Sequence, residues 1–361
     1  MNYSTSYGNL FSRAYISEAA VDLPAVQRFR LRLPSLPTGI VKGKRDIEPD
    51  HMNSRTLFIS EPMGEVVGRC PGSRGHLCCN YITVDQYLGC TLGCSYCVMK
   101  HYLNFEPVTV YADPGPGIRR IRELSSLNKD RSLRVGTGEV GDSLQFDPLF
   151  GLSADYIAGT RDLENVYFEL KTKTDYVDHL LDIPDKGNTV IGFSLNPPEV
   201  IGTEEPHAAS LEARLKAAEK AVDAGYLVSF HFDPIIRYEG WEEQYAGVAA
   251  SLDRFPSSRV AWISLGTFRY LPGLKEKMDP VPYLFEEFVQ CRDGKYRYIQ
   301  KFRIKMYQHM LHSIRGVLDS PVYLCMESDE VWRQVFGDLP RKVDGAREIF
   351  TLPRGLSRKR R

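Results

Sequence analysis

Residues 81–97, Tyr-Ile-Thr-Val-Asp-Gln-Tyr-Leu-Gly-Cys-Thr-Leu-Gly-Cys-Ser-Tyr-Cys, join a strand candidate to three closely spaced cysteines. The predicted strand covers residues 82–88 and ends where the cysteine loop begins. Cys90, Cys94 and Cys97 follow with gaps of three and two residues, and Tyr96 stands just before the third cysteine. This spacing places three thiolates on one short loop.

The number of cysteines in this loop is informative. A structural zinc ion takes four protein ligands in a closed tetrahedron, whereas an iron–sulfur cubane held by three cysteines leaves one iron open. Soft thiolates suit both metals, so count and spacing must decide between them. A zinc site completed by Cys70, Cys78 or Cys79 stays open as the alternative.

Short apolar strands alternate with helical patterns from Tyr81 onward. Such alternation favours parallel strands joined by right-handed crossovers, and six units fit a barrel or partial barrel better than separate domains. The predicted strands after the first are residues 132–138, 166–171, 189–196, 226–232, 260–266 and 321–326.

The helix before the fifth predicted strand has the clearest local signal. Ser210 is a plausible N-cap, and Glu212 in the first turn favours the positive end of the helix dipole. Apolar residues then recur at helical spacing, and Gly225 occupies the place of a C′ glycine. A helix over 211–224 follows from this pattern.

Polar residues follow the predicted strands where each one ends. In a barrel of parallel strands the carboxyl ends meet on one face, which carries the chemistry, and the cysteine loop opens onto the same face. These residues are Glu139, Asp142, Lys173, Ser194, Asn196, Asp233 and Arg237. We expect them to surround the cysteine loop.

The run Gly136-Thr137-Gly138-Glu139 has two interpretations. Glycines let a ligand approach the backbone closely, and the Glu139 carboxylate can accept bonds from an ammonium group. Alternatively the run is a tight turn with a solvated carboxylate.

The ends of the chain differ from its middle. Residues 1–80 show little periodicity and are expected to form a loop-rich extension, residues 81–335 the partial barrel, and residues 336–361 a basic tail. The last four residues, Arg358 to Arg361, are all basic. Such a tail is either solvated or a weak contact for a phosphate backbone.

Composition excludes several classes of protein. The chain has 361 residues, and its 46 basic and 46 acidic residues cancel, so no global field recruits nucleic acid or a membrane surface. Eight cysteines in a chain of this length do not indicate a secreted disulfide scaffold. Neither a signal-peptide core nor a long apolar span is visible in the sequence. A cytoplasmic location without membrane contact is therefore predicted.

The cysteines outside the loop leave alternatives open. Cys70, Cys78 and Cys79 are either inert buried residues or a second metal or redox-thiol site. Cys325, at the end of the last predicted strand, is either packed in the core or faces the cavity as a hydrogen-atom donor. Cys291 has no evident partner and is interpreted as structural.

The spacing of the cysteine loop resembles that of the radical S-adenosylmethionine enzymes, and further segments resemble the spore photoproduct lyase family within that superfamily. They spread over about residues 85–270. Besides the cysteine loop they are KTDYVDHLL (173–181), FSLN (193–196), RLKAA (214–218) with AGY (224–226), and PIIRYEGWE (234–242). The first and last of these are more specific than the cysteine spacing, which marks only the superfamily.

The resemblance implies a partial (βα)6 barrel with Cys90, Cys94 and Cys97 as ligands of a [4Fe–4S] cluster. It places Glu139, Asp142, Lys173 and Ser194 against S-adenosylmethionine, and Arg237 is expected among the polar groups of the cavity. It further implies cleavage of this cofactor to a 5′-deoxyadenosyl radical, DNA lesion repair, and a reductase, flavodoxin or ferredoxin as electron donor.

Two departures from the family concern the end of the reaction. The lyases carry a hydrogen-donor cysteine shortly after the second strand, where this chain has Glu139, and a tyrosine directly after the third cluster cysteine, where it has Val98. A carboxylate cannot replace the thiol, because its O–H bond is far stronger than S–H. Tyr96 and Cys325 are the candidate replacements.

Three functions therefore remain in view. The first is lesion reversal in DNA by a radical S-adenosylmethionine lyase. The second is another radical reaction, on a nucleotide or an unrelated small molecule. The third is a non-catalytic zinc or iron–sulfur module that binds nucleic acid through the basic tail.

Overall fold

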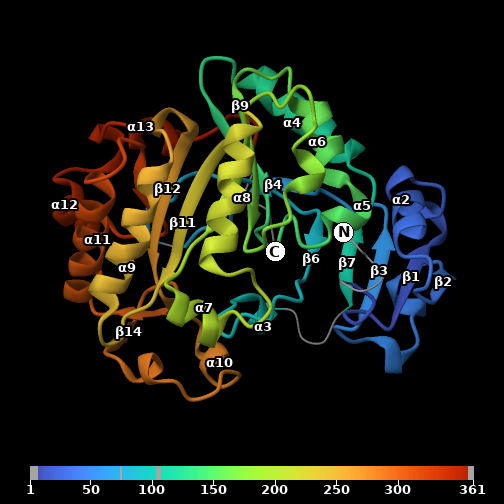
Figure 1. Ribbon diagram of the computed structural model, residues 1–361, viewed down its shortest axis with the longest axis horizontal. Helices are drawn as coiled ribbons and strands as arrows, with labels where there is room; N and C mark the ends of the chain where they lie inside the picture. Colours follow the sequence, from blue (N-terminus) through green and yellow to red (C-terminus); the bar gives the residue numbers. More distant parts are fainter. Residues whose placement is uncertain (1–6, 74, 103–106, 357–361) are drawn as a thin grey trace.

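The computed structural model describes residues 7–73, 75–102 and 107–356. Its centre is an eight-stranded sheet that curls into a partial barrel, with helices on its outer side (Figure 1). The order in space is β16-β12-β11-β10-β9-β8-β5-β4. These strands are β4 (Val67–Arg69), β5 (Ile82–Val84), β8 (Leu133–Thr137), β9 (Val166–Thr172), β10 (Thr189–Ser194), β11 (Leu227–Ile235), β12 (Val260–Thr267) and β16 (Val322–Leu324).

All neighbours in this sheet run parallel except β4 and β5 at one edge. Strand β10 has five buried residues out of six, and β12 has seven out of eight. Strands buried on both faces are typical of parallel sheets covered by helices. The predicted partial barrel is confirmed.

The helices alternate with these strands. They are α4 (Gly115–Leu127), α5 (Asp147–Phe150), α6 (Leu152–Thr160), α7 (Pro198–Glu204), α8 (Leu211–Asp223), α9 (Trp241–Ala250) and α11 (Gln300–Arg315). Helix α8 is the one predicted from sequence: Ser210 Oγ accepts a hydrogen bond from the Ala213 N–H at 3.2 Å, and Gly225 has φ +97°. Ser210 therefore caps the start of the helix and Gly225 ends it, as expected.

The N-terminal region differs from the loop-rich extension that was expected. A second sheet has the order β2-β1-β3-β7-β6, parallel except for the β6–β7 pair. Its strands are β1 (Arg13–Ser17), β2 (Thr38–Val41), β3 (Thr56–Ser60), β6 (Tyr87–Leu88) and β7 (Val108–Tyr111), with α2 (Pro24–Arg32) packed nearby. All five residues of β3 are buried, so no polar alternation marked it in the sequence.

The predicted strand 82–88 is divided between the two sheets. Strand β5 pairs with β8 in the barrel, whereas β6 pairs with β7 in the N-terminal sheet. The change occurs at Asp85 and Gln86. The cysteine loop therefore begins where the two sheets meet.

The rest of the chain covers the barrel beyond β12. A small antiparallel sheet has the order β13-β15-β14, formed by β13 (Arg269–Tyr270), β14 (Phe288–Gln290) and β15 (Tyr296–Tyr298). The remaining helices are α3 (Met99–Tyr102), α10 (Pro272–Lys275), α12 (Asp329–Phe336) and α13 (Ala346–Ile349). The short 3₁₀ turns are η1 (Glu18–Ala20), η2 (Lys44–Asp46), η3 (Pro49–His51), η4 (Asp178–Leu180), η5 (Ser251–Arg254), η6 (Ser257–Arg259), η7 (Pro282–Phe285) and η8 (Pro340–Lys342).

Much of the predicted tail belongs to the folded body. After α13, the Phe350 ring packs edge-on against Trp332 at 5.0 Å between ring centroids. The basic residues Arg358 to Arg361 lie outside the described residues. None of the helices in the described ranges combines the length and apolar character of a bilayer span.

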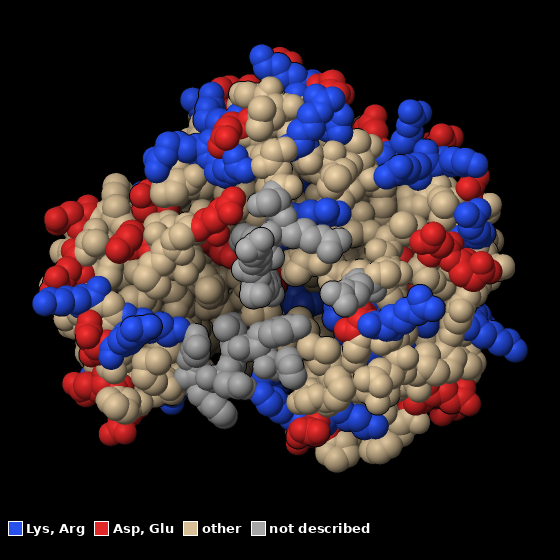
Figure 2. All heavy atoms as spheres, turned by 180° about the vertical axis from the view of Figure 1, so that it is seen from behind, with Lys and Arg blue, Asp and Glu red and all other residues tan. Residues whose placement is uncertain are grey.

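Figure 2 shows the face opposite to that in Figure 1. Basic and acidic side chains are interspersed over it, and a hollow near its centre contains lysine or arginine atoms. This face has no broad stripe of one charge, in keeping with the equal numbers of basic and acidic residues.

Candidate metal and cofactor site

The cysteine loop is held by hydrogen bonds to groups other than its own thiols. The Thr91 N–H donates to Gln145 Oε1 at 3.0 Å, which ties the loop to the segment after β8. On the other side the Ser95 N–H donates to the Glu204 carbonyl at 2.9 Å, at the end of α7. Both of these bonds are made by backbone N–H groups of the loop rather than by its thiols.

The three thiols are neighbours in one loop with graded burial. Cys90 is exposed, Cys97 is half-buried and Cys94 is buried. The Leu92 N–H donates to Cys90 Sγ at 3.4 Å, a bond that also stabilises a thiolate ligand. Burial raises the pKa of the Cys94 thiol to about 12 in the absence of a metal.

Three thiols on one loop match the number of protein ligands that a [4Fe–4S] cluster with one open corner takes, whereas a closed zinc site needs a fourth ligand. Among the described residues, no group of three His, Cys, Asp or Glu side chains is arranged to hold a single metal ion.

A buried carboxylate, Glu205, organises the polar groups beside the loop. Its oxygens accept hydrogen bonds from Lys173 Nζ at 3.1 Å, Asn196 Nδ2 at 2.9 Å, the Tyr96 hydroxyl and Arg214 Nη2. Burial alone would raise the pKa of the Glu205 carboxyl, but Lys173 and Arg214 outweigh it and lower this pKa to about 2. Glu205 therefore stays ionised and fixes its neighbours.

This network decides the placement of three predicted site residues. Tyr96 and Lys173 lie next to the cysteine loop as expected, but their polar atoms are bound to Glu205. Ser194 ends β10, and its carbonyl accepts a bond from Arg214 Nη1 at 2.8 Å. Nothing in the sequence pattern pointed to Glu205, because it follows a helix rather than a strand.

Asp142 acts on the backbone of the site. Its Oδ1 accepts from the N–H groups of Leu144 and Gln145 and from Thr172 Oγ1, each at 2.9 Å, and its Oδ2 accepts from the Lys173 N–H at 2.7 Å. The carboxylate is buried and its acceptors are occupied. Asp142 thus fastens the segment after β8 to the end of β9.

Glu139 is half-buried at the end of β8 and accepts a long bond from the Cys70 thiol at 3.8 Å. The glycines before it serve packing. A Cβ at Gly136 would come within 2.1 Å of the Tyr81 hydroxyl and 2.3 Å of the Glu169 carbonyl. Close approach of other strands, rather than of a ligand, therefore explains this glycine.

A second group of thiols gathers at the same end of the barrel. Cys70 and Cys78 line one cavity, and Cys79 is the next residue in the chain. Cys325, after β16, lies 3.8 Å from Arg269 Nη2 and close enough to Cys70 and Cys79 to affect its ionisation. Three of these four thiols are half-buried, so they are not a packed core cluster.

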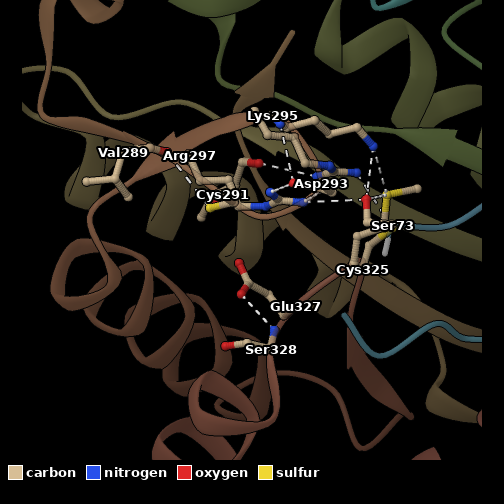
Figure 3. A network of polar contacts seen from close by, with 12 residues as sticks. Ser73, Val289, Cys291, Asp293, Lys295, Arg297, Cys325, Glu327 and Ser328 are labelled. Carbon is tan, nitrogen blue, oxygen red and sulfur yellow. Dashed lines mark hydrogen bonds and ion pairs between the residues drawn. The ribbon is translucent and has the colours of Figure 1, made fainter. Parts of the chain in front are cut away.

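The loop that carries this second group is anchored from a distant hairpin. Figure 3 shows Lys295 and Arg297, from the β14–β15 hairpin, reaching Ser73, while Cys325 lies beside them. Lys295 Nζ donates to Ser73 Oγ at 2.9 Å, and Arg297 Nη2 lies 3.4 Å from the same oxygen. The hairpin therefore holds Ser73 against the barrel end.

The barrel interior contains further charged residues that sequence reasoning missed. Glu169 Oε1 accepts from Trp262 Nε1 at 2.9 Å and lies 2.8 Å from His231 Nε2, while Lys171 Nζ lies 3.9 Å from the Tyr81 ring centroid. Glu169 and Lys171 alternate along β9 with Lys173 at residues 169, 171 and 173. This period of two was the available signal.

Arg237 contacts residues outside the cysteine loop. Its guanidinium pairs with Glu286 and lies 4.1 Å from the centroid of the Phe302 ring. These residues line a separate cavity of about 320 Å³. Among the described residues, the hydrogen bonds and ion pair of Arg237 are with Tyr298 and Glu286 rather than with the cysteine loop.

Comparison with known proteins gives a consistent match in sequence. A family model described as "Spore photoproduct lyase" matches residues 79–266, just over half of the chain. Spore photoproduct lyase of Geobacillus sp. (strain Y412MC61) is 32% identical over 170 residues, which cover 46% of this chain and 49% of that protein. The corresponding protein of Bacillus subtilis (strain 168) is 31% identical over 168 residues, 46% of this chain and 48% of the relative.

Solved structures share the fold over more of the chain than the sequence matches cover. A spore photoproduct lyase complexed with dinucleoside spore photoproduct has a TM-score of 0.76 at 20% identity, covering 87% of this chain and 98% of the other. A variant with bound AdoMet and the same dinucleoside has a TM-score of 0.75, with the same identity and coverage. In sequence, however, the chain spans about half the length of the curated relatives that it matches.

Proposed function

Because the chain belongs to the spore photoproduct lyase family, we propose that it is a radical S-adenosylmethionine enzyme whose Cys90, Cys94 and Cys97 hold a [4Fe–4S] cluster. The observation that carries this proposal is a loop with three thiols whose position is fixed by other groups. When bound, the cluster and S-adenosylmethionine would supply a 5′-deoxyadenosyl radical. An electron donor of the reductase, flavodoxin or ferredoxin class and a cytoplasmic location belong to the same proposal.

The chain's own residues hold this chemistry in place. Glu205 keeps Tyr96 and Lys173 beside the loop, and Asp142 fixes the backbone after β8. Glu139 and Ser194 are the groups proposed to meet polar parts of S-adenosylmethionine. Asp142 and Lys173 act as positioning residues, because their polar atoms already bond to the protein.

The proposed substrate is a thymine lesion of the spore photoproduct type in DNA. Its repair must end with transfer of a hydrogen atom, and the family's donor position is occupied here by Glu139. The thiol that contacts Glu139 is Cys70, at 3.8 Å. We assign the donation to Cys70, since Tyr96 is bound to Glu205 and Cys325 lies beside Arg269.

Metal analysis and cofactor cleavage test the enzyme class. Anaerobic reconstitution should give about four irons with matching sulfide per chain. Dithionite should then produce 5′-deoxyadenosine, and Cys94→Ala should lose both properties while Cys291→Ala keeps them. Zinc without sulfide in the wild-type protein would instead indicate the non-catalytic metal module.

An assay with the lesion as substrate tests the proposed repair reaction and its hydrogen donor. An irradiated thymine dinucleotide should be repaired by the wild type and by Cys325→Ala, whereas Cys70→Ala should still form 5′-deoxyadenosine without completing repair. Cofactor cleavage with no repair by the wild type would favour another nucleotide or small-molecule substrate. Repair that survives Cys70→Ala would remove Cys70 as the donor.

A further inference from the structure

A cavity of about 400 Å³ opens between the segment that joins β4 to β5 and the C-terminal segment around η8 and α13. One wall comes from residues 69–80 and the other from residues 339–352. Arg69 lines the first wall and Arg341 the second, and no aspartate or glutamate is among the described lining residues. The charge of the cavity therefore favours a ligand that carries negative charge.

The two walls of the cavity are joined by Asn80, a buried residue whose backbone adopts the left-handed conformation with φ +54°. Asparagine tolerates this conformation better than most residues. The Asn80 Oδ1 atom accepts a hydrogen bond from Arg69 Nη2 at 2.6 Å, and Asn80 Nδ2 donates to the Phe350 carbonyl at 2.8 Å. A neutral amide thus holds the Arg69 guanidinium in place without neutralising its charge.

The protein does not compensate the charge of either arginine. Among the described residues, no ion pair joins Arg69 or Arg341 to a carboxylate, whereas the neighbouring Lys342 pairs with Asp338 at 3.4 Å. Arg69 is half-buried and Arg341 is exposed. A guanidinium presents its N–H donors in a planar fork that matches the oxygens of a phosphate group. Two such groups on facing walls can therefore bind one phosphate.

Hydrogen bonds outside the cavity hold its walls in place. The Leu77 N–H donates to the Glu327 carbonyl at 2.8 Å, beyond the end of β16. On the other wall, Arg131 Nη1 donates to the Leu352 carbonyl at 2.9 Å. Ser73, which also lines the cavity, is fixed by the β14–β15 hairpin (Figure 3). The cavity is therefore preformed by the fold, as binding pockets usually are.

The cavity adjoins the proposed point of hydrogen transfer. Cys70 lines the cavity, and its thiol donates to Glu139 Oε1 at 3.8 Å. A lesion that receives a hydrogen atom from Cys70 must lie in contact with this sulfur. Because every nucleotide of a DNA strand carries a phosphate, the phosphates next to the lesion then lie close to Arg69 and Arg341.

We propose that this cavity binds a phosphate group of the DNA strand beside the lesion, with Arg69 and Arg341 as the donors. Contacts to phosphates position a strand and carry no sequence information. The site therefore sets the position of the lesion relative to Cys70 rather than recognising the damaged bases. It rests on the proposed function for its substrate, but strand binding itself needs neither the cluster nor the radical reaction.

The test uses the anaerobically reconstituted protein and a fluorescent, undamaged, single-stranded oligothymidylate, whose binding is followed by anisotropy at several salt concentrations. Affinity should fall as salt rises, and the slope of log affinity against log salt should become shallower by about 0.7 in Arg341→Gln, because one phosphate contact is lost. Arg69→Gln should behave alike. Lys342→Gln, the matched control beside Arg341, should keep the wild-type slope.

A charge at the rim gives a second test. Leu352 lines the cavity and is 49% exposed, so its substitution should not disturb the core. Leu352→Glu should weaken binding of the oligonucleotide about two- to fivefold at low salt, because it places a negative charge beside the phosphate. Leu352→Gln, which has nearly the same size without the charge, should bind like the wild type.

Several outcomes would overturn the phosphate site. They are a wild type that does not bind the oligonucleotide, equal salt slopes in Arg341→Gln and wild type, and an equally shallow slope in Lys342→Gln. Thymidine 5′-monophosphate that competes as tightly as the oligonucleotide would assign the cavity to a free nucleotide instead of a strand. Intact binding without repair would refute the proposed function alone. Circular dichroism of each variant verifies that it is folded.

Discussion

The two groups of cysteines at the barrel end are organised in opposite ways. Cys90, Cys94 and Cys97 sit on one loop that is fixed by Gln145 and Glu204, and their sulfurs are free for a ligand. The second group comes from the segment between β4 and β5 and from the end of β16, and within it Cys70 donates a long hydrogen bond to Glu139. Sulfurs on one braced loop suit a metal cluster, whereas the sulfurs of the second group come from segments that only the packing of the barrel brings to one region.

The largest expected effect comes from removing the carboxylate that braces the first group. Glu205→Gln leaves Lys173 and Arg214 without their buried counter-charge, which should lower the free energy of unfolding by about 3–5 kcal/mol. Urea denaturation would measure it. Iron content should fall as well. Full stability in the variant would contradict this role of Glu205.

Acid should act on the same group in the wild type. The pKa of Glu205 is about 2 in the folded chain, against an ordinary value near 4.5. The contribution of the ionised Glu205 to the free energy of unfolding is therefore fully present above the unfolded pKa. It is lost as the pH falls from about 4.5 towards 2, and it amounts to about 3 kcal/mol. Denaturation midpoints across this range would measure it. Glu205→Gln should lose less free energy of unfolding over the same pH interval. An equal pH dependence in the variant and the wild type would show that Glu205 is not the group responsible.

The second group should respond to its neighbouring cations. Lys171→Met removes a positive charge near Cys79, so the pKa of the Cys79 thiol should rise from about 5 by about one unit. Alkylation rates at Cys79 as a function of pH, located by mass spectrometry, would measure the shift. Lys216→Met, on the surface of α8, is the matched control and should leave this pKa unchanged. A pKa that falls in Lys171→Met would contradict the electrostatic cause.

The smallest effect is expected at a cysteine that belongs to neither group. Cys291 lies in the β14–β15 turn, where its thiol donates to the Val289 carbonyl at 3.8 Å. Cys291→Ser should change the free energy of unfolding by no more than about 0.5 kcal/mol, because the site is on the surface and the bond is long. Iron content should stay at the wild-type level. A fall in iron content would show that Cys291 also affects the first group of cysteines.

The sequence predicted the barrel better than the N-terminal sheet that packs beside it. Helix α8 and the strands β8, β9, β10, β11, β12 and β16 follow from apolar runs, caps and turn residues that act locally. The N-terminal sheet was missed, because β3 is buried on every side and its short run carries no alternation. The predicted strand 82–88 was split for a different reason: partner strands in two sheets compete for it.

For the site, the sequence determined which residues share a loop or a strand end. The match of the family model to residues 79–266 confirmed the family that this pattern suggested. Spacing along the chain is enough for Cys90, Cys94 and Cys97, since seven residues cannot separate them far. Only the tertiary structure could bring Glu205 to Lys173 and Arg214, or Cys70 to Glu139, which lie 69 positions apart. Contacts of this kind depend on how strands pair and helices pack, and no local pattern records them.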